Sequence, residues 1–119
     1  MPWQQEVGRA GEEAALGFLC AQGWRLIGRN LRDRYGELDL VGLENGELVF
    51  VEVKARSGVR CGTPEEAWTP EKRRRLWKTA AHFLQQRAPA RWRFDLVVVG
   101  FRPGAIAVRR YRNVWGRWG

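Results

Sequence analysis

The chain has 119 residues, a net charge of +8 and two cysteines, and this length suffices for one domain, residues 1–119, with its own core. It has no apolar run of membrane-spanning length, and residues 1–6 lack the basic region and apolar core of a signal peptide, so a cytoplasmic protein is expected. Cys20 and Cys61 have no metal-ligand spacing and His82 is the only histidine, which disfavours zinc fingers and histidine-based nucleases.

The charge is divided unevenly along the chain. Residues 1–55 hold nine acids and six bases, a net of −3, whereas residues 56–119 hold fifteen bases and four acids, a net of +11. An acidic half that meets a basic half suggests a cation site beside a surface that binds a polyanion. The alternative is a general preference for Arg, with solvated basic faces.

Residues 4–22 are expected to form a helix that ends at Gly23. Its apolar positions form a stripe made of Val7, Gly11, Ala14 and Phe18. Glu12 flanks the packed face, whereas Glu13 lies nearer to the solvent. Glu12 is therefore the better candidate for a site, and an ordinary solvated acid is the alternative.

Two strands are expected next, at residues 24–31 and 36–41, separated by a polar turn. Because side chains alternate along a strand, Leu38 and Leu40 should share one face of the second strand. The opposite face then carries Glu37, Asp39 and Val41.

The strand at residues 47–54 is strongly apolar and ends in two opposite charges. Alternation places Glu52 and Lys54 on the same face as Phe50. Two such charges would be costly to bury unpaired, so a functional site is favoured here over a chance surface position. If this strand pairs with the preceding one through a turn at residues 44–46, Asp39 comes near both charges.

Two acids and a lysine on neighbouring strands suggest a metal centre. The carboxylates of Asp39 and Glu52 are suitable ligands for a hard divalent cation, Mg²⁺ or Mn²⁺. Lys54 would act beside this cation, on the negative charge of the substrate and on the water that the cation activates. Of the 21 basic residues 18 are Arg, so a Lys at position 54, where Arg is not equivalent, is informative.

A second helix is expected over about residues 70–87, with Thr69 as its cap and Pro70 in its first turn. The same signal at residues 63–66 predicts a short helical turn before it, after a loop at residues 57–63. Its inward side chains are Leu76, Ala80, Phe83 and Leu84. Its first turn carries four cations, which oppose the helix dipole and which a nearby anion would relieve. A basic solvated face is the alternative. The residues expected to contact nucleic acid are Arg56, Lys72, Arg73 and Arg75.

Residues 91–100 have the apolar density of a central strand, and residues 105–109 are a candidate fifth strand. The segment 110–119 interleaves cations with aromatic residues and is a candidate flexible or partner-binding tail. Such a segment can hold phosphates and stack on bases, or its aromatic residues can pack back on the domain or on a partner.

The order of these motifs resembles the PD-(D/E)xK nuclease superfamily. Over about residues 8–102 the chain resembles the YraN family of small bacterial proteins, which are similar in fold to archaeal Holliday-junction resolvases. The matching stretches are residues 11–15, 29–30, 36–40, 50–56 and 93–95, with Lys72 and Ala80.

This resemblance implies an α/β restriction-endonuclease-like core, in which helices flank a central mixed sheet of about four or five strands in the order α-β-β-β-α-β-(β). It also implies metal-ligand roles for Asp39 and Glu52, a catalytic role for Lys54 and a supporting acid at Glu12. The resolvase likeness favours a homodimer.

Three functions fit these observations. The first is a metal-dependent endonuclease that acts on branched or junction DNA and selects by structure rather than by sequence. The second is a nucleic-acid-binding protein that does not cut. Against it, a nuclease site that had lost its activity would be expected to lack one of Asp39, Glu52 or Lys54, and all three are present. The third is a structural role, in which Glu52 and Lys54 form an edge-strand ion pair and the basic half binds a ribosomal or membrane partner.

Overall fold

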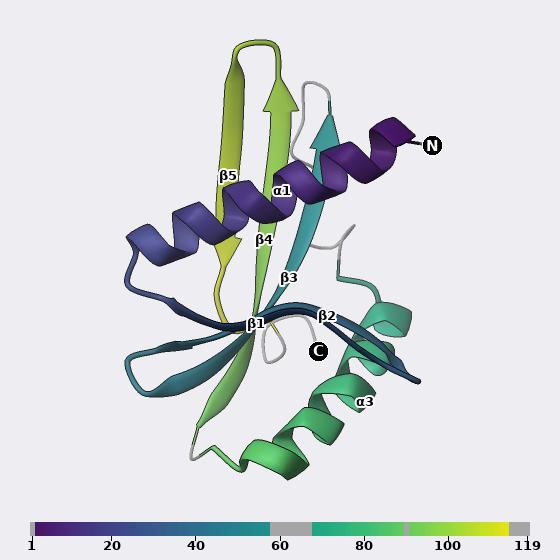
Figure 1. Ribbon diagram of the computed structural model, residues 1–119, viewed down its shortest axis with the longest axis vertical. Coiled ribbons are helices and arrows are strands. Elements are labelled where there is room, and N and C mark those ends of the chain that lie inside the picture. The colour runs from purple at the N-terminus through teal and green to yellow at the C-terminus, as the bar shows by residue number, and fades with distance from the viewer. Residues whose placement is uncertain (1, 58–67, 90, 115–119) are drawn as a thin grey trace.

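The computed structural model shows a five-stranded mixed sheet with a helix on each face (Figure 1). It describes residues 2–57, 68–89 and 91–114. In chain order the elements are α1 (Pro2–Ala21), β1 (Arg25–Asp33), β2 (Gly36–Glu44), β3 (Glu47–Ser57), α3 (Pro70–Arg87), β4 (Trp92–Arg102) and β5 (Ala105–Tyr111). This order confirms the α/β class and the expected succession of helices and strands.

The strands lie side by side in chain order, from β1 to β5. Every neighbouring pair is antiparallel except β3 and β4, which are parallel. A parallel pair needs a crossover connection, and α3 lies in that connection. Neither described helix has the length and apolarity needed to cross a membrane.

Alternation along β3 divides the core into two layers. Val49 and Val51 pack with Ala15 and Leu19 of α1, which crosses strands β3, β4 and β5 in Figure 1. Phe50 packs in the other layer, with Leu76 and Ala80 of α3. The expected division of the β3 side chains between two faces is therefore confirmed.

The packed stripe of α1 differs from the expected one by about one position. The buried residues are Gly11, Ala15 and Leu19, whereas Ala14 and Phe18 are half-buried. At Gly11 the helix approaches β3 so closely that a Cβ would collide with Ala55.

Leu38 and Leu40, which were expected on one face of β2, pack in different layers of the core. Leu40 lies in the α1 layer, whereas Leu38 lies in the α3 layer. The backbone pairing of β2 with β3 ends at Leu40 and Val51, and the β1–β2 hairpin then turns away from the sheet (Figure 1). Asp39 therefore lies where the two strands separate.

The β2–β3 connection is the expected tight turn. Asn45 and Gly46 have φ angles of 52° and 77°, as a type I′ hairpin turn requires. Asn and Gly tolerate this left-handed backbone at little cost.

Helix α3 begins and ends where its sequence predicts. The Thr69 hydroxyl accepts a hydrogen bond from the backbone N–H of Lys72 at 3.2 Å, and Pro70 occupies the first turn. The expected helical turn before it, at residues 63–66, lies outside the described residues. Most of the expected loop at 57–63 does so too, and Ser57 ends β3.

A buried ion network joins β2, β4 and β5. Asp95, with no exposed surface, accepts hydrogen bonds from Arg93 and Arg110. Glu44 accepts from the same two arginines and from Arg112. The pKa of Glu44 falls to about 2 because Arg110 and Arg93 donate to its carboxylate, which outweighs the effect of burial.

The start of the expected tail belongs to this packed region. The Arg110 side chain is 4% exposed, and Val114 is fully buried in the α3 layer. Residues 115–119 lie outside the described part of the chain.

Candidate functional site

Asp39 lies at the point where β2 separates from β3. Its Oδ2 accepts a hydrogen bond of 2.8 Å from the backbone N–H of Val53. The described backbone ladder between these strands has already ended at Leu40, so the Asp39 side chain takes the place of a main-chain partner. This bond fixes the carboxylate beside β3.

Glu52 lies beside Asp39, and the two side chains line one pocket. The Glu52 side chain is 7% exposed. Burial raises its pKa well above the usual value, the neighbouring Asp39 raises it further, and the charges of Lys72 and Lys54 oppose these effects. The structure therefore brings together the two acids that the sequence placed on neighbouring strands.

Lys54 is two residues beyond Glu52 on β3 and so lies on the same face of the strand. It is half-buried. Burial lowers the pKa of its ammonium, and the positive charges of Lys72 and Arg56 lower it further. A lysine in this state gives up its proton more readily than a solvated one does.

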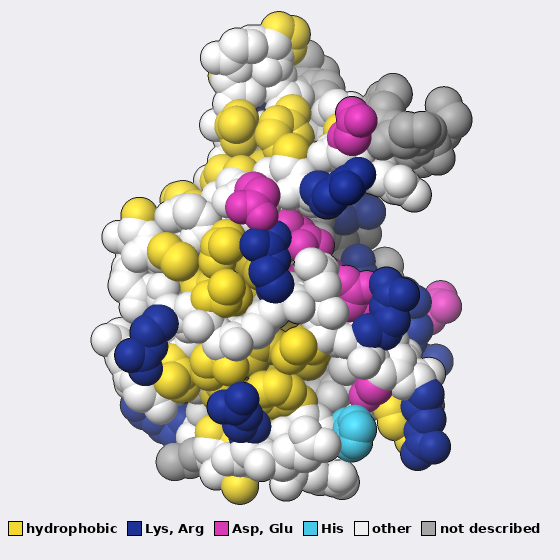
Figure 2. Space-filling model, in the orientation of Figure 1, with side chains coloured by type: hydrophobic (Ala, Val, Ile, Leu, Met, Phe, Trp, Pro, Cys, Tyr) yellow, Lys and Arg dark blue, Asp and Glu magenta, His cyan; other side chains and the backbone are white. Residues whose placement is uncertain are grey.

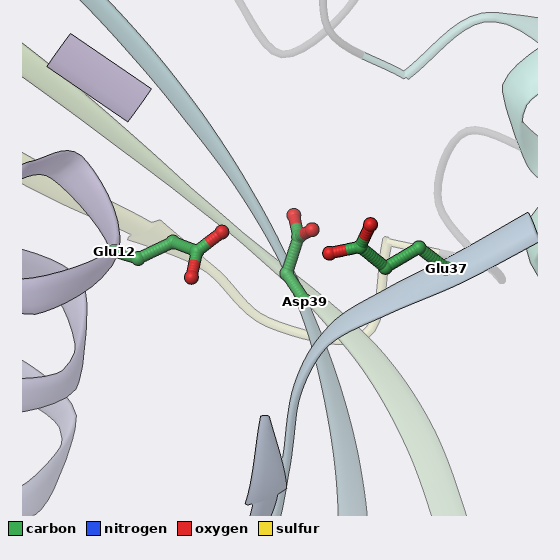
Figure 3. A group of neighbouring side chains, drawn as sticks. All are labelled: Glu12, Glu37 and Asp39. Atoms are coloured by element: carbon green, nitrogen blue, oxygen red, sulfur yellow. The ribbon is translucent and has the colours of Figure 1, made fainter. Parts of the chain in front are cut away.

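Glu12 reaches this place from α1. One oxygen from each of Glu12, Glu37 and Asp39 lies within 4.8 Å of the others, and Figure 3 shows the three carboxylates pointing toward one another. Burial and the charge of Asp39 raise the pKa of Glu12. The neighbouring Glu13 is 64% exposed and pairs with Arg29 at 2.7 Å, so Glu12 is the acid of this pair that joins the cluster.

Glu37 was absent from the expected set of site residues. The signal for it was present, because the second residue before Asp39 shares its face on a regular strand. The structure keeps the two acids together even though β2 bends at this point. Glu37 also pairs with Arg32 at 2.8 Å, on the outer side of the hairpin.

A basic wall faces the acids from α3. Lys72 and Arg75 line a pocket of about 160 Å³ together with Glu37, Asp39 and Glu52. The Lys72 Nζ lies 3.9 Å from a Glu52 oxygen. Figure 2 shows acidic side chains gathered in the middle of one face of the molecule, with Lys and Arg side chains beside them.

The other two expected nucleic-acid contacts lie outside the lining of this pocket. Arg73 is half-buried, and within the described part of the chain its Nε is buried without a hydrogen-bond partner. Arg56 is half-buried on β3, close enough for its charge to act on Lys54.

The site draws on both faces of the sheet because β2 leaves β3 at Asp39. Glu12 comes from the helix on one face, and Lys72 comes from the helix on the other. Glu12, Glu37 and Asp39 meet at one point, and Glu52 lies beside Asp39; burial raises the pKa of Glu12 and of Glu52, and the charge of Asp39 raises both further. Their oxygens are the donors that hard divalent cations prefer, and a cation would relieve the repulsion.

The class defined by this fold is an α/β domain with the element order of a restriction-endonuclease-like core. The chain belongs to the uncharacterised protein family UPF0102, whose profile matches residues 11–99. This is the family expected from the sequence under the name YraN.

Curated relatives support this assignment over most of the chain. The UPF0102 protein STH1475 of Symbiobacterium thermophilum is 47% identical over 114 residues, which cover 93% of this chain and 97% of the relative. The UPF0102 protein FRAAL5785 of Frankia alni is 43% identical over 112 residues, covering 92% and 93%. A UPF0102 protein of Lachnoclostridium phytofermentans is 47% identical over 95 residues, covering 77% and 80%.

Proposed function

We propose that this protein is a metal-dependent endonuclease that acts on DNA and selects branched or junction substrates by their shape. The observation that supports this most is that Asp39 and Glu52 line one pocket, with Lys54 on the same face of β3 as Glu52. Carboxylates that can hold a divalent cation, with an ammonium group beside them, are groups that metal-assisted phosphodiester hydrolysis can use.

The donor set suits Mg²⁺ or Mn²⁺. Asp39 and Glu52 would hold the ion, and Glu12 and Glu37 are within reach of the same Asp39 carboxylate. When bound, the cation supplies a water of lowered pKa and stabilises charge on the scissile phosphate. The hydrogen bond from Val53 holds Asp39 in a fixed orientation for this role.

Lys54 has two roles open to it on this proposal. Its lowered pKa suits a group that accepts a proton from the attacking water, and its charge suits a non-bridging phosphate oxygen. Lys72 balances the charge of Glu52 while that carboxylate has no cation beside it.

The substrate would be bound by the basic wall on α3, which is formed by Lys72 and Arg75. Lys72 and Arg75 line the acidic pocket, and Arg56 and Arg73 lie on the adjoining parts of β3 and α3. Contacts from such side chains to phosphates carry no sequence information, so discrimination between DNA molecules must come from their shape.

The test is cleavage with Mn²⁺ of a four-way junction, a flap, a single strand and a blunt duplex. The wild-type protein should cut the branched substrates, and Glu52→Gln and Lys54→Ala should abolish cleavage while DNA affinity stays within a few-fold, because the basic surface supplies the affinity. Glu13→Gln is the matched control for Glu12→Gln: the exposed acid should be dispensable, and the clustered one should not.

A second candidate is a protein that holds nucleic acid without cutting it. Its support is that the acids have partners within the chain: Val53 donates to Asp39, and Lys72 lies near Glu52. Tight binding of branched DNA with no cleavage in Mn²⁺ would favour this function over the endonuclease.

A further inference from the structure

Lys72 of α3 extends across the acidic pocket toward Glu52 of β3. Its Nζ lies 3.9 Å from a Glu52 oxygen. The Glu52 side chain is 7% exposed and the Lys72 side chain is 27% exposed, so a partly solvated cation faces a buried acid. Both residues line the pocket together with Asp39, which is the other acid proposed to hold a divalent cation.

The position of Lys72 is unfavourable for a cation that has no acid beside it. Lys72 lies in the first turn of α3, where the helix dipole repels positive charge. Its charge also acts on Lys54, whose pKa it lowers. The Glu52 carboxylate offsets both effects, because it is the acid that the Lys72 ammonium faces. The place of this ammonium therefore depends on the negative charge of Glu52.

The contact is one that the Lys72 side chain can give up. A separation of 3.9 Å is too long for a hydrogen bond between an ammonium and a carboxylate, so charge alone holds the pair. The backbone of Lys72 is fixed separately, because its N–H donates to the Thr69 hydroxyl at 3.2 Å. The flexible stem of the lysine can therefore turn toward another anion while α3 stays in place.

Lys72 would lose this partner with a divalent cation bound to Asp39 and Glu52. The carboxylate that it faces would then have two added positive charges beside it, in a pocket of about 160 Å³. Cations that share one partly buried acid repel each other more strongly than they would in water. The Lys72 ammonium would then need a different anion, and on the proposed function a phosphate of the bound DNA is available.

We propose that Lys72 alternates between two partners: the Glu52 carboxylate while the pocket holds no divalent cation, and a DNA phosphate once it holds one. This inference rests on the proposed function, which supplies both ligands. Because binding of the cation makes a phosphate contact available, cation and DNA should each raise the affinity for the other by the same factor. Arg75, which is exposed and lines the same pocket, would contact DNA in either state.

The first measurement is the Mn²⁺ affinity without DNA, by calorimetric titration in mildly alkaline buffer. Lys72→Met keeps an unbranched apolar stem and removes the charge, and Arg75→Met removes the other charge of the basic wall. Lys72→Met should bind Mn²⁺ at least about five-fold more tightly than the wild type, because the ion no longer displaces a charge about 4 Å from its ligand. Arg75→Met should raise the affinity less, and Lys72→Arg, which keeps the charge, should resemble the wild type.

The second measurement is the affinity for a four-way junction, by fluorescence anisotropy at constant ionic strength, in EDTA and in Ca²⁺. Ca²⁺ takes the same oxygen ligands, and a gel run afterwards checks that the junction is uncut. Lys72→Met should lose about five-fold in affinity in Ca²⁺, as expected for one phosphate contact, and should match the wild type in EDTA. Arg75→Met should lose the same factor in both conditions.

Equal Mn²⁺ affinities of the wild type and Lys72→Met would overturn this exchange of partners. A loss of DNA affinity in Lys72→Met that is the same in EDTA and in Ca²⁺ would overturn it too, because Lys72 would then be a phosphate contact in both states, as Arg75 is. The proposed function fails differently: the wild type would cut no DNA in Mn²⁺, while both differences at Lys72 remain. Cleavage by the wild type with neither difference would retain the endonuclease and reject the exchange.

Discussion

The Asp39 carboxylate accepts a hydrogen bond of 2.8 Å from the backbone N–H of Val53, at the point where β2 and β3 separate. The same carboxyl group lies within 4.8 Å of Glu12 and Glu37 oxygens and lines one pocket with Glu52. Asp39 therefore has two roles: it holds β2 to β3 through Val53, and it supplies a carboxylate to the acidic cluster.

The two roles of Asp39 can be separated by two substitutions. Asp39→Asn and Asp39→Ala both remove the charge, but only Asn keeps an oxygen that can accept from Val53. Asp39→Ala should therefore have a free energy of unfolding about 1 kcal/mol lower than Asp39→Asn, as expected for one hydrogen bond. Both variants should lose Mn²⁺ binding, measured by calorimetric titration. Equal stabilities in urea denaturation would show that the hydrogen bond contributes nothing.

The raised pKa of Glu52 predicts how stability depends on pH without a cation. The folded state holds a proton that the unfolded state has already released above its ordinary pKa of 4.5, so stability falls as pH rises from 4.5 through the raised folded value. Above this window Glu52→Gln should be more stable than the wild type, and below pH 4.5 the two should converge.

Thermal melting in EDTA across this pH range tests the Glu52 prediction. Added Mn²⁺ should raise the melting temperature of the wild type and leave Glu52→Gln almost unchanged, because the cation needs the ionised carboxylate. A wild type as stable as the variant at neutral pH would mean that burying this carboxylate costs nothing.

The ion network around Glu44 predicts the opposite response to pH. Its pKa is lowered from 4.5 to about 2, so the stability it contributes is present above pH 4.5 and is lost as pH falls toward 2. At neutral pH, Glu44→Gln should lower the free energy of unfolding by on the order of 3 kcal/mol. The difference from the wild type should shrink in acid.

Urea denaturation at neutral pH and at about pH 3 measures this difference. Glu6→Gln is a control, since Glu6 is exposed and such changes usually stay within about 0.5 kcal/mol. A Glu44 variant that loses Mn²⁺ binding while keeping its stability would contradict the assignment of this network to the fold.

The basic wall should govern the dependence of DNA affinity on salt. Lys72→Ala with Arg75→Ala should lower the slope of log affinity against log salt by roughly one to two, because each lost phosphate contact removes about 0.7–0.9. Arg102→Ala with Arg109→Ala removes the same charge from exposed positions on β4 and β5. If this control pair lowers the slope equally, net charge and not the pocket wall determines binding.

Local patterns determined much of this protein. The Asn45-Gly46 turn, the Thr69 cap and the alternation along β3 each depend on neighbours in the chain, and all three are as expected. Helical spacing also separated the exposed Glu13 from Glu12. These features follow from dihedral preferences and from the fixed periods of helices and strands.

The tertiary structure decided where the strands separate and which charges meet. Leu38 moves to the α3 layer because β2 leaves β3 beyond Leu40, and no local period encodes that bend. Glu44 and Arg110 are 66 residues apart in the chain and form an ion pair. This pair buries the Arg110 side chain, which the sequence alone assigned to an exposed tail. Alternation fixes which side chains share a face of a strand, but the bend of that strand decides which layer of the core each side chain meets, and the bend depends on packing between distant segments.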